Sequence, residues 1–197
     1  MIHRPRFLPL ASLLGVATLL AACSTPMHRG GGPMAAAKLE STRGNTASGM
    51  VMFHAMGDHA MMHARVEGLK PGQEHGFHIH EKGDCSSGDG MSTGGHFNPG
   101  AKPHGAPGKA DRHAGDLPSL KADAQGRAEV RVRVDGISIG SGAADIVGKG
   151  LIVHAMPDDY TTQPTGNSGG RIACGVISGV AGRDAAGREQ PLPQITM

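Results

Sequence analysis

Residues 49–66 read GMVMFHAMGDHAMMHARV, and apolar positions alternate with others along both halves of this stretch. Side chains two residues apart lie on the same face of an extended strand. The turn signal Gly57-Asp58 separates the two halves. The stretch therefore predicts an antiparallel hairpin with a buried face and an exposed face. The side chains expected on the buried face are Val51, Phe53, Ala55, Ala60, Met62, Ala64 and Val66.

The rest of the chain shows more short strands with turn signals between them. We expect strands at 75–80, 120–124, 127–134, 150–155 and 171–177, with the second and third of these paired as a hairpin. Val130, Val132 and Val134 are expected to face inward. Residues 81–118 and 156–170 lack periodicity and predict two long functional loops. This pattern indicates an all-β fold, an antiparallel barrel or sandwich.

Composition excludes several other classes of protein. The 197 residues include 32 Gly and 13 Pro, which argues against a helical bundle. Aromatic residues make up 3% of the chain and the formal net charge is +2, so we expect no nucleic-acid partner. The chain also contains 12 histidines. Because neutral imidazole is the commonest metal ligand in proteins, metal chemistry is the first function to consider.

The N-terminus has the pattern of an export signal. Arg4 and Arg6 precede an apolar stretch at 7–20, which is too short to span a bilayer comfortably. The sequence Leu-Ala-Ala before Cys23 resembles a bacterial lipobox, which implies cleavage before Cys23 and lipidation of its thiol. An ordinary secretory signal with an incidental cysteine is the alternative. Both interpretations place the protein outside the cytoplasm, and the first makes it a membrane lipoprotein of the cell envelope that faces the periplasm.

This pattern divides the chain into four parts. We expect a signal peptide at 1–22, a small and polar tether at 23–35, one domain at 36–182 and a C-terminal tail at 183–197. Removal of the signal removes two arginines, so the mature chain has a formal charge of zero.

Histidines gather on one predicted strand and the loop that follows it. His78 and His80 are two residues apart and so share a strand face, an arrangement that suits copper or zinc. His104, His113 and Asp116, with one more imidazole, can form a tetrahedral zinc site. His96 in the loop and His154 at the end of a later strand add further ligands. Seven ligands are too many for one ion, so the sequence predicts two metals.

Four segments resemble the signature segments of copper/zinc superoxide dismutases. They are GFHIH at 76–80, GGHFNP at 94–99, HAGD at 113–116 and GNSGGRIACGVI at 166–177. The resemblance covers roughly residues 36–180. It implies a Greek-key β-barrel or sandwich and the dismutation of superoxide to O2 and H2O2 by copper that alternates between Cu2+ and Cu+.

The resemblance also implies a role for each ligand. Copper would be held by His78, His80, His96 and His154, and zinc (Zn2+) by His96, His104, His113 and Asp116. His96 would bridge the metals and take part in catalysis. Asp158 would link ligands of the two metals, although a solvated loop carboxylate is the alternative.

Further implications concern the substrate and the cysteines. Arg171 would hold the superoxide anion beside the copper. Electrostatic steering would come from Arg171 or from cationic residues of the first loop, namely Lys82, Lys102, Lys109 and Arg112. The family joins the cysteines that correspond to Cys85 and Cys174 in a disulfide, which fits an oxidising compartment.

Family members differ in oligomeric state, so a monomer and a homodimer both stay open. The alternative function is a non-catalytic copper- and zinc-binding envelope lipoprotein that stores or delivers copper.

A second group of candidate ligands lies on the exposed face of the first hairpin. Thioether and imidazole ligands suit Cu(I), so this face is a candidate accessory copper patch. A mildly apolar surface or a protein contact is the alternative. The residues of the patch are Met50, Met52, His54, Met56, His59, Met61 and His63.

Overall fold

A computed structural model describes Met1 and residues 32–180. The expected signal peptide, Cys23 and the C-terminal tail lie outside the described residues. Within the described part of the chain, no helix is both long and apolar enough to cross a membrane.

The described residues form antiparallel strands, with a single 3-10 turn, η1 (Met91–Thr93), in the first long loop. This confirms the expected all-β fold. The strands are β1 (Met34–Ser41), β2 (Ser48–Ala55), β3 (His59–Glu67), β4 (Glu74–His75), β5 (Phe77–His80), β6 (Leu120–Lys121), β7 (Ala128–Asp135), β8 (Gly150–His154), β9 (Arg171–Val176) and β10 (Ser178–Val180).

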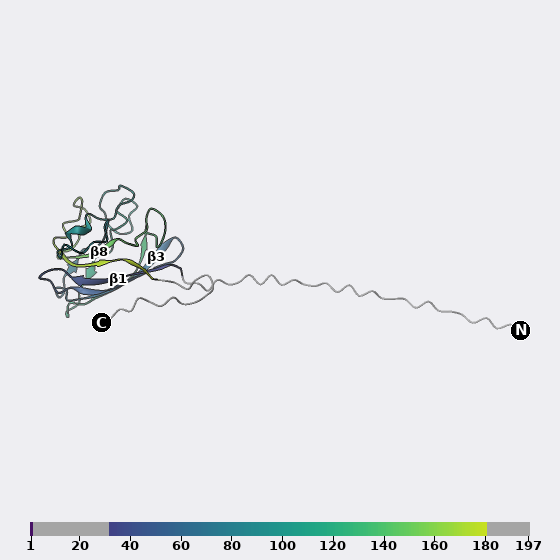
Figure 1. Ribbon diagram of the computed structural model, residues 1–197, viewed down its shortest axis with the longest axis horizontal. Coiled ribbons are helices and arrows are strands. Elements are labelled where there is room, and N and C mark those ends of the chain that lie inside the picture. The colour runs from purple at the N-terminus through teal and green to yellow at the C-terminus, as the bar shows by residue number, and fades with distance from the viewer. Residues whose placement is uncertain (2–31, 181–197) are drawn as a thin grey trace.

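The main sheet has the strand order β5-β8-β9-β1-β2-β3-β7, and β10 pairs with β1. Pairing of β3 with β7 and of β5 with β8 requires the chain to cross between the two ends of the sheet, as in a Greek key. Figure 1 shows this sheet curled, with the long loops gathered on one side of it. Strand β1 contributes to the curl because its first part pairs with β2 and its last two residues pair with β9.

The hairpin at 49–66 forms in the expected register. Val51 lies opposite Ala64 and Phe53 opposite Met62, and all four side chains are buried. Gly57 occupies the turn with φ 74, a conformation that costs little only for glycine. Burial of these apolar side chains against β5 and β8 residues of the same core is the main stabilising contribution to the fold.

Two strand boundaries and one strand pairing differ from the expectations. Strand β1 begins at Met34, so the last two residues assigned to the tether belong to the domain, and Ala35 is fully buried. The strand expected at 75–80 is interrupted at Gly76. The predicted hairpin of 120–124 with 127–134 is wrong, because β6 pairs with β4 while β7 pairs with β3. Val134 of β7 is buried as expected, and Val130 and Val132 pack partly buried against the core.

Candidate metal centre

Four histidines meet where β5, the end of β8 and the first loop come together. They are His78, His80, His96 and His154, each has one candidate ligand atom, and these atoms all lie within 4.8 Å of one another. All four residues are at least nine-tenths buried.

One nitrogen of each of these rings has no hydrogen-bond partner. These atoms are Nδ1 of His78 and Nε2 of His80, His96 and His154, and they are four of the six unpartnered buried side-chain atoms in the described residues. A buried nitrogen without a partner is costly unless something else fills its lone pair. Four such atoms around one point fit a copper ion held by imidazoles.

A second group lies directly beside the first and shares His96 with it. Its other members are His104, His113 and Asp116, and its ligand atoms also lie within 4.8 Å of one another. Three Nδ1 atoms surround Oδ1 of Asp116, at 2.9 Å from His96, 3.0 Å from His104 and 3.3 Å from His113. Three nitrogens and one carboxylate oxygen are the ligand set of a closed zinc site.

His96 therefore faces the first group through Nε2 and the second through Nδ1. The structure thus brings together all seven ligands expected from the sequence, in two groups joined by one imidazole.

The loop that contains the shared ligand is attached to β5 by backbone hydrogen bonds. Ile79 N donates to Gly115 O over 2.9 Å, and Phe97 N donates to Ile79 O over 2.8 Å. A Cβ on Gly115 would lie 2.3 Å from Ile79 O, so only glycine permits this approach. The loop is therefore held in place by main-chain contacts as well as by its ligands.

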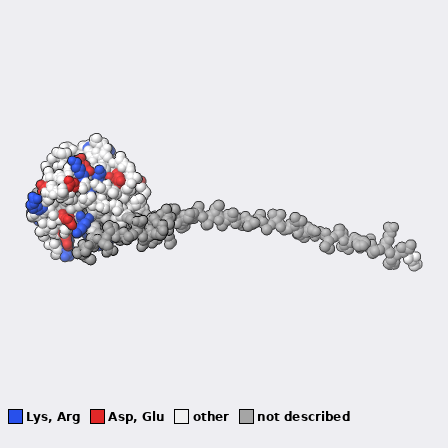
Figure 2. All heavy atoms as spheres, in the orientation of Figure 1, with Lys and Arg blue, Asp and Glu red and all other residues white. Residues whose placement is uncertain are grey.

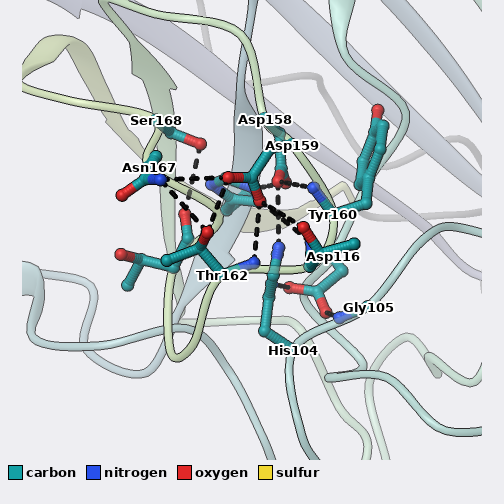
Figure 3. A network of polar contacts seen from close by, with 12 residues as sticks. His104, Gly105, Asp116, Asp158, Asp159, Tyr160, Thr162, Asn167 and Ser168 are labelled. Atoms are coloured by element: carbon teal, nitrogen blue, oxygen red, sulfur yellow. Dashed lines mark hydrogen bonds and ion pairs between the residues drawn. The ribbon is translucent and has the colours of Figure 1, made fainter.

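Asp158 connects the two groups from the second long loop. Its Oδ2 lies 2.7 Å from His78 Nε2. Its Oδ1 lies 2.9 Å from His104 Nε2 (Figure 3). Both carboxylate oxygens are thus bonded to the ring nitrogens that face away from the candidate metals. Such a carboxylate fixes the tautomer and the orientation of a ligand ring.

Three residues of the second loop that the sequence pattern did not single out order the loop around Asp158 and its partner His104. Gln163 accepts a hydrogen bond from His104 N and donates one to His104 O. Asp159 accepts hydrogen bonds from the backbone of Thr161 and Thr162 (Figure 3). Tyr160 N donates to Asp158 Oδ1 over 2.7 Å, and the Tyr160 hydroxyl bonds to Ser119, directly after the first loop. An aspartate with threonines two and three residues later is a local turn signal that points to Asp159, whereas nothing in the sequence pattern indicates Gln163.

Arg171 is half-buried at the start of β9. Its guanidinium donates to the carbonyl oxygens of Gly90 and Gly94 and to the Thr93 hydroxyl, over 2.6–2.8 Å. Its charge is among the causes that lower the pKa values of His80 and His154, after burial and the neighbouring histidines. The guanidinium is therefore fixed near the four-histidine group.

The sulfur atoms of Cys85 and Cys174 form a disulfide, as the resemblance implies. This bond ties the start of the first loop to β9, three residues beyond Arg171. Arg171 and the disulfide thus hold the same segment of the loop against the same strand.

Burial and local charge set the protonation of the two groups differently. Burial lowers the pKa of His96 to about 4 and holds that of His80 well below its usual range. Burial opposes the charged forms of Asp116 and His104, but hydrogen bonds outweigh it. Bonds from three histidines keep the pKa of Asp116 well below its usual value, and bonds to Asp116 and Asp158 raise that of His104 to about 9.

Two other residues lie outside the two groups. His75, for which the sequence predicts no role, is buried, and its Nδ1 lies 2.8 Å from the carbonyl oxygen of His154. Arg112 is not available for steering because it is buried and donates to the carbonyl oxygens of His113 and Asp135. Figure 2 shows acidic and basic side chains interspersed over the visible face of the described domain.

A curled antiparallel sheet with two adjoining histidine-rich groups defines a β-barrel protein with two candidate metal sites. Residues 47–177 match the sequence profile of the copper/zinc superoxide dismutase (SODC) family. The chain belongs to this family.

Solved structures agree with this assignment. The clock protein EA4 is 39% identical, with a TM-score of 0.68, over 74% of this chain and 93% of that chain. A SOD-like protein from Bacillus subtilis is 36% identical, with a TM-score of 0.65, over 72% of this chain and 96% of that chain. A double mutant of a SOD-like protein from the same organism is 37% identical, with a TM-score of 0.66, over 73% and 97%.

Proposed function

We propose that this protein is a copper/zinc superoxide dismutase, which converts two superoxide anions and two protons into O2 and H2O2. The observation that supports this most strongly is the set of four buried imidazole nitrogens without partners beside a fixed guanidinium. Family membership is consistent with the same activity.

In this proposal His78, His80, His96 and His154 hold copper, and His96, His104, His113 and Asp116 hold zinc. Copper supplies a one-electron couple, and zinc, which has no redox chemistry, supplies a fixed positive charge. Asp158 keeps the rings of both groups in position through His78 and His104.

Arg171 attracts the anionic substrate. Its guanidinium is held by carbonyl oxygens, which fix its direction without neutralising its charge. With residues 1–22 removed, the chain has a formal charge of zero, Arg171 included, so attraction of the anion depends on the local position of Arg171 rather than on net charge.

In this proposal His96 is the proton donor. Its Nε2 is buried and has no protein partner, while its Nδ1 stays directed at Asp116. In the part of the cycle in which Nε2 is not bound to copper, this nitrogen could hold a proton and donate it to the reduced substrate, with the ring anchored from the other side by the second group.

The proposal includes export to the cell envelope, with Cys23 lipidated and the domain facing the periplasm. The pattern of residues 1–23 and the disulfide support this location, because disulfides persist in oxidising compartments.

The test is superoxide removal by purified protein reconstituted with copper and zinc, normalised to measured metal content. We expect activity that requires copper and is abolished in His154→Gln. A matched change outside the centre, His54→Gln, should retain it. Full occupancy of both metals without activity would contradict the proposal and favour the non-catalytic carrier.

A further inference from the structure

Methionine and histidine side chains form a regular array on the outer face of the β2–β3 hairpin. Three successive cross-strand pairs on this face each contain one Met and one His, and the two residue types exchange strands from pair to pair. The pairs are Met52 with His63, His54 with Met61 and, beside the turn, Met56 with His59. We call these six residues the Met–His ladder.

The central four side chains of the ladder are close enough to share one ligand. Directly opposed residues in an antiparallel pair have Cβ atoms about 4.5–5.5 Å apart, and diagonal neighbours about 7–8 Å apart. Met52, His54, Met61 and His63 occupy two adjacent opposed positions and are all partly buried. Flexible thioether side chains can close the remaining gap. The register therefore allows two sulfurs and two imidazole nitrogens to reach one ion.

Other thioethers adjoin this group. Met34 of β1 lies opposite His54, and Met50 is the next outward residue along β2.

Carboxylates orient two of the ladder histidines without entering the array. Nε2 of His63 lies 2.8 Å from Glu129, and Nδ1 of His59 lies 2.8 Å from Asp58. Because each bonded nitrogen carries the proton, the other nitrogen of each ring keeps its lone pair available. The same carboxylate–histidine arrangement orients ligand rings at metal sites.

The chemistry of the ladder selects for one kind of ion. Its donors are neutral thioethers and imidazoles, and soft ligands of this kind favour Cu(I) over hard divalent ions. Arg131 and Arg133 of β7 lie opposite His63 and Met61, and Asp58 and Asp135 pair with Arg133, so the selectivity of the ladder rests on its donor atoms rather than on nearby charge.

We propose that the Met–His ladder binds Cu(I) at its central four residues. This site is separate from the candidate metal centre, which is built on β5, β8 and the two long loops. The ladder lies on β2 and β3, on the part of the sheet beyond β9 and β1. It would allow the domain to hold reduced copper independently of its enzymatic site.

The test is anaerobic titration of metal-free protein with Cu(I) against the chromophoric chelator bathocuproine disulfonate. A Cys23→Ser background removes a thiol that would itself bind Cu(I). We expect the variant carrying Met52→Leu, His54→Gln, Met61→Leu and His63→Gln to bind one Cu(I) fewer than its parent. X-ray absorption should show sulfur neighbours of copper in the parent, and these should be lost in the variant.

Matched controls separate the ladder from the rest of the protein. Met91→Leu with Met156→Leu removes two exposed methionines outside the ladder and should leave the titration unchanged. His80→Gln with His154→Gln should lower Cu(I) binding yet retain the sulfur signal. Circular dichroism reports whether the fourfold ladder variant folds. The single change Met61→Leu should weaken Cu(I) binding at the ladder at least tenfold.

Equal stoichiometry and equal sulfur signal in the ladder variant and its parent would overturn the proposal. Displacement of Cu(I) from the ladder by equimolar Zn(II) would also overturn it, because it would indicate a site for divalent ions.

Discussion

The guanidinium of Arg171 is positioned by three hydrogen bonds to residues 90–94 rather than by a carboxylate. Arg171→Met keeps the length of the side chain but removes its charge and donors. We expect the rate constant for superoxide removal to fall about 10- to 100-fold, as for loss of a hydrogen bond to a charged group. Assays at equal metal content measure this change. Arg131→Met on β7 is the matched control, and an equal loss in both variants would contradict the role of Arg171.

The proton on His104 makes zinc binding depend on pH. In the metal-free protein, hydrogen bonds to Asp116 and Asp158 outweigh burial and raise the pKa of His104 to about 9. The ring is therefore protonated at pH 7, and zinc can bind Nδ1 only after a proton leaves. We expect zinc binding at pH 7 to release about one proton, with less release above pH 9 and weaker zinc binding as the pH falls.

Calorimetry in buffers of different ionisation enthalpy measures this proton release. The same measurement on His104→Gln should show the release removed, and an unchanged release would show that the proton comes from another group.

At the scale of secondary-structure elements, Asp158 joins two loops that the chain order keeps far apart. Asp158→Asn preserves the shape of the side chain but leaves one of the two imidazoles without an acceptor. Loss of such a partner typically costs 10- to 100-fold in metal affinity. We expect a loss of about that size for zinc and copper together, measured by competition with chelators. Asp111→Asn, at an exposed position of the first loop, should change neither affinity.

The disulfide belongs to the same scale, because it holds the segment that positions Arg171. Replacing Cys85 and Cys174 by serine removes a cross-link between residues 89 positions apart. We expect the free energy of unfolding to fall by about 2–5 kcal/mol, as measured by urea denaturation of the metal-free protein. Activity at equal metal content should also fall, because residues 90–94 lose one of their attachments to β9. A folded double-serine variant with full activity at equal metal content would show that Arg171 alone positions residues 90–94.

The sequence predicts the elements whose signal is local. Alternation along 49–66 predicts the hairpin and its faces, and the ligand residues are recognisable because histidine alone supplies an imidazole to a metal. Strands β4 and β6 are two residues long, too short for any periodicity, so their pairing could not be predicted. The contact of Gln163 with the backbone of His104 spans 59 positions and leaves no local pattern. The burial of Arg112 depends likewise on distant carbonyl oxygens.

At the scale of the whole molecule, the proposed membrane attachment of the domain depends on Cys23. Strand β1 begins at Met34, and the 11 residues from Cys23 onward can span at most about 40 Å when extended. A lipid on Cys23 would therefore keep the domain within that distance of a membrane while leaving the metal centre accessible to a small diffusing anion.

Cys23→Ser tests this arrangement in cells. We expect the unaltered protein to sediment with membranes and to incorporate labelled fatty acid, whereas the variant does neither, because serine cannot be lipidated as the thiol is. Superoxide removal per bound copper should be the same in both, since Cys23 lies outside the domain. If both proteins appear in the soluble envelope fraction without label, the N-terminus is an ordinary secretory signal. That result would be consistent with export without an anchor, as the disulfide suggests, because disulfides persist in oxidising compartments.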